Sequence, residues 1–226
     1  MTTSATSSAT TLAAGGGSNN STSTFDFPRE YHFPPFFTRQ TNVNTRRAQL
    51  EKWSSLILAY CAHHRLYKLS LSASAASNSN SDSSHNNNSA EANAEENLFH
   101  NRRLNRRLST ADAREVLDFM RKEGRAEFVG GGGGGGGGDG STGGDVAWIY
   151  WKTPEEWAKE LESWVDETAQ KGTVLTLYEL TQGEDTRGST FHGLDPDLLQ
   201  KALQVLVKRG KAQIFGQEDS QGVKFF

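Results

Sequence analysis

The hydrophobic and polar positions of the chain follow one pattern twice. The stretches RKEGRAEFV (121–129) and VKRGKAQIF (207–215) correspond residue by residue in character. Upstream of each stretch, apolar residues recur three or four positions apart, as on one face of a helix. Within each stretch, apolar and polar residues then alternate, as they do in a strand. The pattern therefore predicts the same helix–strand unit in both halves of the chain.

Residues with strong capping preferences mark both ends of the two predicted helices. Ser109 and Asp195 are suited to the N-cap position, because their side-chain oxygens can accept hydrogen bonds from free backbone N–H groups. Gly124 and Gly210 are placed to end the helices in the left-handed conformation. We therefore expect one helix over 109–123 and a second from Asp195 to the region of Gly210.

The elements around each unit predict a known architecture. In the second half, Thr153 and Thr176 each begin a capping box that opens a helix, and the strand TVLT lies between the two helices. A turn at 220–222 and a last strand, VKFF, follow the repeated unit. The order helix, strand, helix, helix, strand, turn, strand is that of a winged helix. The first half fits the same plan with a helix over 45–64 (opened by Asn44 or Thr45), a strand near 67–71, a helix near 97–107, a helix over 109–123, a strand over 126–129 and a returning strand over 146–151.

Three segments are too poor in large apolar side chains to build a core. Residues 1–24 and 72–94 are rich in Ser, Asn and Ala, and 130–144 contain a run of glycines. Such compositions predict disorder. We therefore predict an α+β protein with two tandem winged-helix domains, divided into a disordered tail (1–24), a Pro/aromatic docking arm (25–43), a first winged-helix domain (44–151, with insertions 72–94 and 130–144, the latter as its wing) and a second winged-helix domain (152–226).

The segment YHFPPFFTRQTN (31–42) concentrates aromatic rings and two adjacent prolines beside the polar tail. Prolines without N–H groups exclude the interior of a helix or a central strand. Two interpretations remain: an arm folded on its own domain, or a polyproline-type segment that inserts aromatic rings into a pocket of another subunit. We favour the second, which expects Phe36 and Phe37 outside this protein's own core. A WW-domain partner is not expected, because Phe37 lacks the tyrosine hydroxyl of PPxY ligands.

Charge and motif content argue against several function classes. The net charge of −3 gives no overall attraction to nucleic acid, and the predicted third helix of each domain carries acidic as well as basic residues. We interpret the basic cluster RRLNRR (102–107) as a solvated face. The histidines lack partners at metal-ligand spacing, and no nucleophile motif occurs. The sequence therefore predicts a non-enzymatic protein with no catalytic residue, metal or cofactor.

Other features predict a cytoplasmic protein. The single Cys61 excludes a disulfide framework and, in mid-helix, is expected to be a small core residue. The N-terminus has no apolar stretch like that of a signal peptide, and no run of 18 apolar residues occurs. We therefore expect a cytoplasmic protein that reaches membranes only through its partners, without direct membrane insertion.

Five motifs in order carry a resemblance to a known family: YHFPPFFTRQTNVNTRRAQLEKWSSLILAYC, TPEEWAKELESWV, TLYELTQGEDT, FHGLD and GVKFF. Together they resemble the small tandem winged-helix subunit of the endosomal sorting complex ESCRT-II. The resemblance implies a heterotetramer of two copies of this chain and two larger winged-helix subunits. It implies that the arm docks on the larger subunits through Phe33, Pro34, Pro35, Phe36 and Phe37.

The resemblance also implies a role for the second domain. In the family, this domain recruits and activates the first-acting ESCRT-III subunit during multivesicular-body sorting of ubiquitinated membrane proteins, which would place the chain peripherally at the endosomal membrane. We expect the ESCRT-III contact at Val174 and Leu175, in a short strand whose apolar side chains can stay exposed. Two departures stand out: only Pro28 occupies the place of an upstream Pro-Pro motif, and both low-complexity insertions are unlike the family.

A nucleic-acid-binding winged-helix protein of a transcription assembly is the alternative function. Helix-turn-helix relatives of this fold place a helix in the major groove. Binding to DNA would weaken steeply with added salt, whereas docking through aromatic rings would hardly change.

Replacing both insertions, 72–94 and 130–144, by short turns should leave the fold intact. Neither segment supplies predicted core residues, and shortening a loop changes its closure entropy by only about 1 kcal/mol. Thermal unfolding followed by circular dichroism should give a melting temperature close to that of the full chain. A collapse of the melting temperature would show that one of the insertions packs against the protein.

Overall fold

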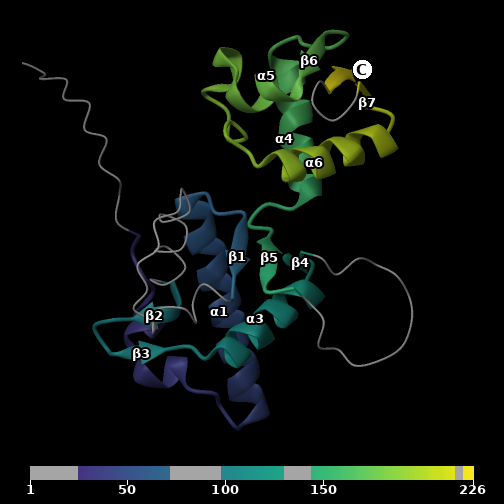
Figure 1. The fold of residues 1–226 in the computed structure, drawn as a ribbon. Coiled ribbons are helices and arrows are strands. Elements are labelled where there is room, and N and C mark those ends of the chain that lie inside the picture. The colour runs from purple at the N-terminus through teal and green to yellow at the C-terminus, as the bar shows by residue number, and fades with distance from the viewer. Residues whose placement is uncertain (1–24, 72–97, 130–143, 217–220) are drawn as a thin grey trace, which may run out of the picture.

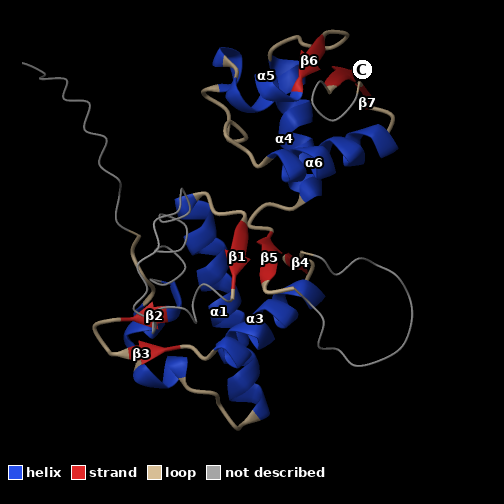
Figure 2. Ribbon diagram, viewed as in Figure 1, coloured by secondary structure: helices blue, strands red, loops and turns tan. Residues whose placement is uncertain are grey.

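The computed structural model describes residues 25–71, 98–129, 144–216 and 221–226. The predicted tail (1–24), the insertion 72–94, residues 130–143 of the glycine tract and residue 220 of the turn at 220–222 lie outside the described residues. The described residues form two winged-helix domains in tandem, with the second domain above the first in Figure 1. Figure 2 shows that each domain combines helices with a small three-stranded sheet, and that the first domain also holds the paired strands β2 and β3.

The first domain packs two helices on a three-stranded antiparallel sheet. Helix α1 (Val43–His64) begins before the expected Asn44 or Thr45, because the side chain of Asn42 accepts the N–H groups of both residues, at 3.0 and 3.1 Å. The sheet has the order β1-β5-β4. The elements that follow α1 are β1 (Lys68–Ser70), α3 (Thr110–Lys122), β4 (Ala126–Phe128) and β5 (Val146–Ile149).

The helix expected near 97–107 is wrong for most of its length. Residues 98–99 are helical, but β2 (His100–Asn101) and β3 (Arg106–Arg107) then pair as an antiparallel hairpin. The turn places Asn105 at φ 49°, a left-handed conformation that asparagine tolerates better than most residues. The side-chain oxygen of Asn101 accepts the Leu104 N–H at 3.0 Å, which holds the turn. The cluster RRLNRR therefore lies in a hairpin and not on a helix.

The second domain repeats the order of the first. Its sheet, β6-β8-β7, corresponds to β1-β5-β4, so the internal repeat is confirmed. Both capping boxes are present, at Thr153 with Glu156 and at Thr176 with Glu179. The elements are α4 (Pro154–Glu167), β6 (Val174–Thr176), α5 (Leu177–Gln182), η4 (Glu184–Thr186), α6 (Pro196–Lys208), β7 (Ala212–Phe215) and β8 (Gly222–Phe225).

The predicted caps of the repeated helices are also confirmed. The side chain of Ser109 accepts the Asp112 N–H, and that of Asp195 accepts the Asp197 N–H. Gly124 and Gly210 have φ values of +72° and +69°, in the region where a side chain would be strained. These local signals set the helix limits in both halves.

The first core includes the arm, which corrects one expectation. Phe36 and Phe37 are only 6% and 5% exposed and pack in the core of their own domain. The ring of Phe36 stacks on Trp53 with centroids 4.4 Å apart, and Phe37 meets Trp53 edge-on at 5.4 Å. The expectation that both rings lie outside this core is wrong, because Trp53 on α1 offers a large apolar face that the arm can cover. Cys61 is a buried core residue, as expected.

Strand β5 belongs to both cores. Alternate residues of a strand point to opposite faces, and here Ala147 and Ile149 join the first core while Trp148 and Tyr150 join the second. The rest of the second core comes from α4, α5, α6, the segment between α5 and α6, and the second sheet. The predicted boundary between the two domains, after residue 151, therefore comes directly after β5 and Tyr150, whose side chains pack in both cores.

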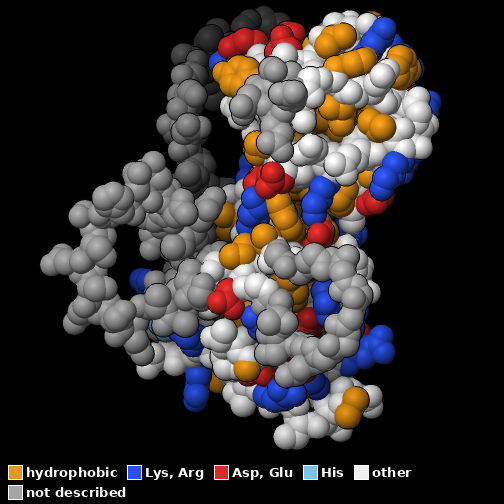
Figure 3. Space-filling model, turned by 45° about the vertical axis from the view of Figure 1, so that its right-hand side comes forward, with side chains coloured by type: hydrophobic (Ala, Val, Ile, Leu, Met, Phe, Trp, Pro, Cys, Tyr) orange, Lys and Arg blue, Asp and Glu red, His pale blue; other side chains and the backbone are white. Residues whose placement is uncertain are grey.

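Charged side chains cross the junction between the domains (Figure 3). Lys68 of β1 lies 3.2 Å from carboxylate oxygens of Asp195 and Asp197. In the opposite direction, Lys201 of α6 lies 2.7 Å from Glu127. It also donates to the Tyr150 hydroxyl at 2.7 Å. Burial and the hydrogen bond to Glu127 raise the pKa of Tyr150 well above its ordinary value. The two domains are therefore joined by apolar and by ionic contacts.

Truncation of Phe36 should destabilise the free chain. Phe36→Ala removes the ring that stacks on Trp53 and leaves a cavity, which should lower the free energy of unfolding by about 3–4 kcal/mol. Urea unfolding followed by tryptophan fluorescence measures this change. Phe33→Ala is the control and should change stability by less than about 0.5 kcal/mol, because Phe33 is exposed. An unchanged midpoint for Phe36→Ala would show that the arm leaves the domain in solution.

The two terminal aromatic residues should differ in their effect on stability. Phe225 is 2% exposed and packs in the second core, whereas Phe226 is 52% exposed. Phe225→Ala should cost about 3–4 kcal/mol of unfolding free energy and Phe226→Ala less than about 1 kcal/mol. Equal urea midpoints for the two variants would contradict this assignment.

Candidate functional site

The arm presents a short apolar ridge formed by Phe33, Pro34 and Pro35. All three residues are exposed, Phe33 to 60%. The arm is not an extended polyproline segment: it folds into two 3-10 turns, η1 (Arg29–His32) and η2 (Pro34–Phe37). The two prolines open η2, where their missing N–H groups leave no intrahelical hydrogen bond unmade. The five residues predicted to dock on a partner therefore divide into an exposed ridge and two buried rings, Phe36 and Phe37.

Two side chains of α1 hold the carbonyl groups of the arm. The indole N–H of Trp53 donates to the Phe36 carbonyl at 2.9 Å. The amide of Gln49 donates to the carbonyls of Phe36 at 2.8 Å and Thr38 at 2.9 Å, with a longer contact to Pro35 at 3.3 Å. Backbone carbonyl groups that have no partner in a helix or sheet need side-chain donors of this kind. The ridge is therefore carried on a backbone that α1 fixes in place.

Arg46 links this clamp to α3. Its guanidinium donates to the Gln49 side-chain oxygen at 2.8 Å and to Glu115 at 2.6 and 3.1 Å. A further hydrogen bond of 3.0 Å reaches Asp112. The hydrogen bond from Arg46 holds the pKa of Glu115 below its ordinary value, so this carboxylate stays charged near neutral pH. The orientation of Gln49, and through it the arm, thus depends on an ion-pair network between α1 and α3.

The start of the arm has its own attachments. The side-chain amide of Asn101, in the β2–β3 hairpin, donates to the Tyr31 carbonyl at 2.8 Å. Lys52 of α1 pairs with Glu30 at 2.6 Å, and this hydrogen bond lowers the pKa of Glu30. The ring of Tyr31 is buried, which raises the pKa of its hydroxyl. Hairpin and helix therefore fix the arm on two sides.

Sequence reasoning missed the residues that hold the arm. Arg46, Gln49 and Trp53 lie three and four positions apart on α1, so they share one face of that helix. A polar pair beside a tryptophan on an otherwise apolar face is the signal that could have found them. Asn101 could not have been found in this way, because the segment around it was predicted to be helical.

The second candidate site, Val174 and Leu175, is only partly exposed. Val174 is 57% exposed on edge strand β6, whereas Leu175 is half-buried and packs against the second core. Val174 lies opposite Lys224 of β8, and Phe215 of β7 lies opposite Gly222. Directly paired residues share a face of the sheet. Val174, Phe215 and Lys224 therefore lie on the outer face of this sheet.

Three of the basic residues on the helices that would read DNA are engaged in ion pairs. On α3, Arg114 lies 3.1 Å from Asp145, and Arg121 lies 3.3 Å from Asp118. On α6, Lys201 is held by Glu127 at the domain junction. Phosphate binding needs uncompensated positive charge, so these contacts favour a protein partner over nucleic acid. Among the helices of the described residues, none combines the length and the apolar character needed to cross a bilayer.

Comparisons with known proteins agree on one family. The family model for the ESCRT-II complex subunit matches residues 30–195. The vacuolar protein-sorting-associated protein 25 of Homo sapiens is 39% identical over 203 residues, which are 90% of this chain and 98% of the human protein. The proteins of that name from Xenopus laevis and Dictyostelium discoideum are 37% and 36% identical, and the matches span 89% and 91% of this chain and 99% and 98% of theirs.

Solved structures lead to the same family. The crystal structure of subunit VPS25 of the endosomal trafficking complex ESCRT-II has a TM-score of 0.68 at 28% identity and covers 88% of this chain and 98% of its own. A crystal structure of the endosomal complex ESCRT-II (VPS22/VPS25/VPS36) gives a TM-score of 0.67, with the same identity and coverage. With the family model matching most of the chain and relatives similar over their full length, this chain belongs to the ESCRT-II complex subunit family.

Proposed function

We propose that the chain is a non-enzymatic adaptor of an endosomal ESCRT-II complex, in which it binds larger subunits similar to VPS22 and VPS36. The observation that carries the proposal is the exposed Phe33–Pro34–Pro35 ridge on a fixed arm, in a chain of this family. The complex would hold two copies of this chain and act peripherally at the endosomal membrane in multivesicular-body sorting of ubiquitinated membrane proteins.

The arm binds as a preformed unit. Because Gln49, Trp53 and Asn101 already fix its backbone, docking would order few further residues and lose little conformational entropy. Phe33 supplies the large side chain that enters a pocket of the partner, with Pro34 and Pro35 beside it. Phe36 and Phe37 contribute indirectly, since they attach the arm to its own domain.

The second domain would recruit and activate the first-acting ESCRT-III subunit. Val174 supports this assignment, because a large apolar side chain stays exposed on an edge strand. Leu175 would contribute mainly by holding β6 on the core. The chain would thereby bind the larger subunits through its arm and the ESCRT-III subunit through its second domain.

Loss of the ridge should weaken assembly while leaving the fold unchanged. Phe33→Ala combined with Pro34→Ala should reduce affinity for the larger subunits by about 2–4 kcal/mol, as expected for a central aromatic contact. Co-purification of the three subunits and calorimetry of purified components measure this loss. Binding should change little between low and moderate salt, because the contact is apolar.

Val43→Ala is the matched control, since Val43 is an exposed apolar residue at the start of α1. It should leave assembly unchanged. Full assembly by the Phe33/Pro34 double variant would refute docking through the ridge. Steep salt dependence together with binding to duplex DNA would favour the nucleic-acid alternative.

A further inference from the structure

The hairpin β2–β3 carries the cluster RRLNRR (102–107), which the adaptor function proposed above does not use. Residues 98–108, which we call the arginine hairpin, hold four arginines and no acidic residue, whereas the net charge of the whole chain is −3. Figures 1 and 2 show this hairpin on the first domain, away from the second, with its turn protruding from the fold. The hairpin is therefore a local concentration of positive charge on a protein that has no positive charge overall.

Buried side chains hold the arginine hairpin on its domain. Phe99 and Leu108 are buried in the first core, and the Leu108 N–H donates to the Phe99 carbonyl at 2.9 Å. Leu104, in the turn, is partly buried against the same core. The buried Asn101 joins the turn to the arm, because it accepts the Leu104 N–H and donates to the Tyr31 carbonyl. The turn is therefore fixed before any partner binds, which lowers the entropy cost of docking.

The side chains that this fixed turn exposes are mostly arginines. Arg102, Arg103 and Arg106 are exposed, and Arg107 is half-buried. Within the described parts of the chain, neither Arg103 nor Arg106 takes part in an ion pair or a side-chain hydrogen bond. These two guanidinium groups are therefore available to a ligand.

Carboxylates on the elements next to the hairpin are already paired. Glu30 of η1 lies 2.6 Å from Lys52. On α3, which follows the hairpin in the chain, Asp112 and Glu115 are both bound by Arg46. These carboxylates therefore leave the positive charge of the exposed arginines uncompensated.

The shape of the hairpin decides which anionic partner fits. A protruding turn offers no groove to enclose a peptide, and strands of two residues are too short to form a ribbon that fills the major groove of a duplex. The exposed residues of the turn include no aromatic ring on which the bases of a single strand could stack. A flat anionic surface needs neither feature, and lipid phosphates match the paired N–H donors of a guanidinium group.

We propose that the arginine hairpin contacts the anionic headgroup layer of a membrane, with Arg103 and Arg106 bound to lipid phosphates. Leu104 stays on its own core, so no side chain of the turn enters the hydrocarbon layer. A basic residue near an anionic leaflet raises affinity by about fivefold. One hairpin therefore binds weakly and reversibly, and two copies of the chain in one complex would bind more firmly through multivalency.

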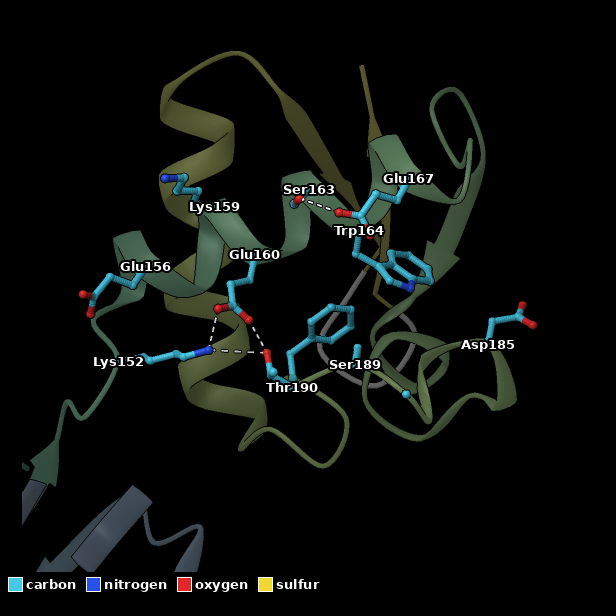
Figure 4. A pocket seen from close by; sticks show the side chains of 12 residues that line it. Lys152, Glu156, Lys159, Glu160, Ser163, Trp164, Glu167, Asp185, Ser189 and Thr190 are labelled. Carbon is cyan, nitrogen blue, oxygen red and sulfur yellow. Dashed lines mark hydrogen bonds and ion pairs between the residues drawn. The ribbon is translucent and has the colours of Figure 1, made fainter. Parts of the chain in front are cut away.

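The second domain carries the opposite charge on one of its surfaces. Figure 4 shows a groove along α4 that is lined by four carboxylates and two lysines: Glu156, Glu160, Glu167, Asp185, Lys152 and Lys159. Negative charge is therefore in excess there. An anionic membrane would repel this groove while it attracts the arginine hairpin, and this difference favours one orientation of the chain toward the bilayer.

This contact goes beyond the adaptor function proposed above, since it uses neither the ridge of the arm nor β6. It gives the chain a membrane contact of its own, in place of the expectation that the chain reaches membranes only through its partners. The contact is made at the surface and needs no spanning helix.

Co-sedimentation of the full chain with lipid vesicles tests the proposal. The vesicles would contain phosphatidylcholine alone or phosphatidylcholine mixed with phosphatidylserine. We expect the chain to sediment with the mixed vesicles only, and less as salt is added, because salt screens exposed charges. Arg103→Gln/Arg106→Gln should weaken this association by at least about tenfold, from about fivefold for each arginine. Its melting temperature should stay unchanged, because both side chains are exposed.

The charge-matched control is Lys159→Gln/Arg209→Gln, which removes two exposed basic residues of the second domain that also lie outside the ion pairs of the described residues. It should change the association by less than about twofold, because these charges lie far from the hairpin. Equal losses for the two double variants would overturn the proposal, since they would show a response to net charge only. Failure of the unaltered chain to sediment with the mixed vesicles would overturn it as well.

Other ligands of the hairpin are separate outcomes of the same comparison. If Arg103→Gln/Arg106→Gln lost binding to an RNA oligonucleotide or to a glutamate-rich peptide but not to the mixed vesicles, the membrane contact would be refuted. Co-purification with the larger ESCRT-II subunits should be normal in this variant. Its loss would place the hairpin in the subunit interface and would also overturn the proposal, whereas failure of the unaltered chain to assemble would refute the adaptor function alone.

Discussion

The contact between Trp53 and the arm is the interaction on which the first domain depends. The indole stacks on Phe36, meets Phe37 edge-on and donates its N–H to the Phe36 carbonyl. One side chain therefore covers two rings and satisfies a carbonyl group of an irregular segment. Aromatic pairs of this kind contribute about 0.5–1.5 kcal/mol beyond area burial. Without Trp53, Phe36 and Phe37 would lose the ring against which both pack, and the prolines of the arm would prevent it from joining the sheet.

The burial of Phe36 and Phe37 changes the meaning of the Pro-Pro-aromatic motif. A motif with aromatic residues on both sides of two prolines can present one set of rings and bury the other. Here the 3-10 turn that begins at Pro34 places Phe33 outside and Phe36 inside. The motif thus combines a contact surface with its own attachment to the domain, and the two parts can be separated by substitution.

Much of the fold could be predicted from local signals, and the reasons are visible at particular residues. The repeat, the capping boxes at Thr153 and Thr176 and the glycine at 124 are encoded within a few residues of where they act. The hairpin around Asn101 was missed, because one of the hydrogen bonds that hold it joins Asn101 to Tyr31 of the arm, seventy residues away in sequence. The burial of Phe36 was missed for the same reason: only the tertiary position of Trp53 decides it.

The crossed ion pairs at the domain junction have a mechanical consequence. Lys68 reaches from the first domain to Asp195 and Asp197, while Lys201 reaches back from the second domain to Glu127. Both lysines also approach the ring of Trp148, at 4.2 and 5.3 Å, so a rotation of one domain against the other would have to separate these contacts. The junction therefore opposes rotation between the domains and favours one orientation of the arm relative to the second domain.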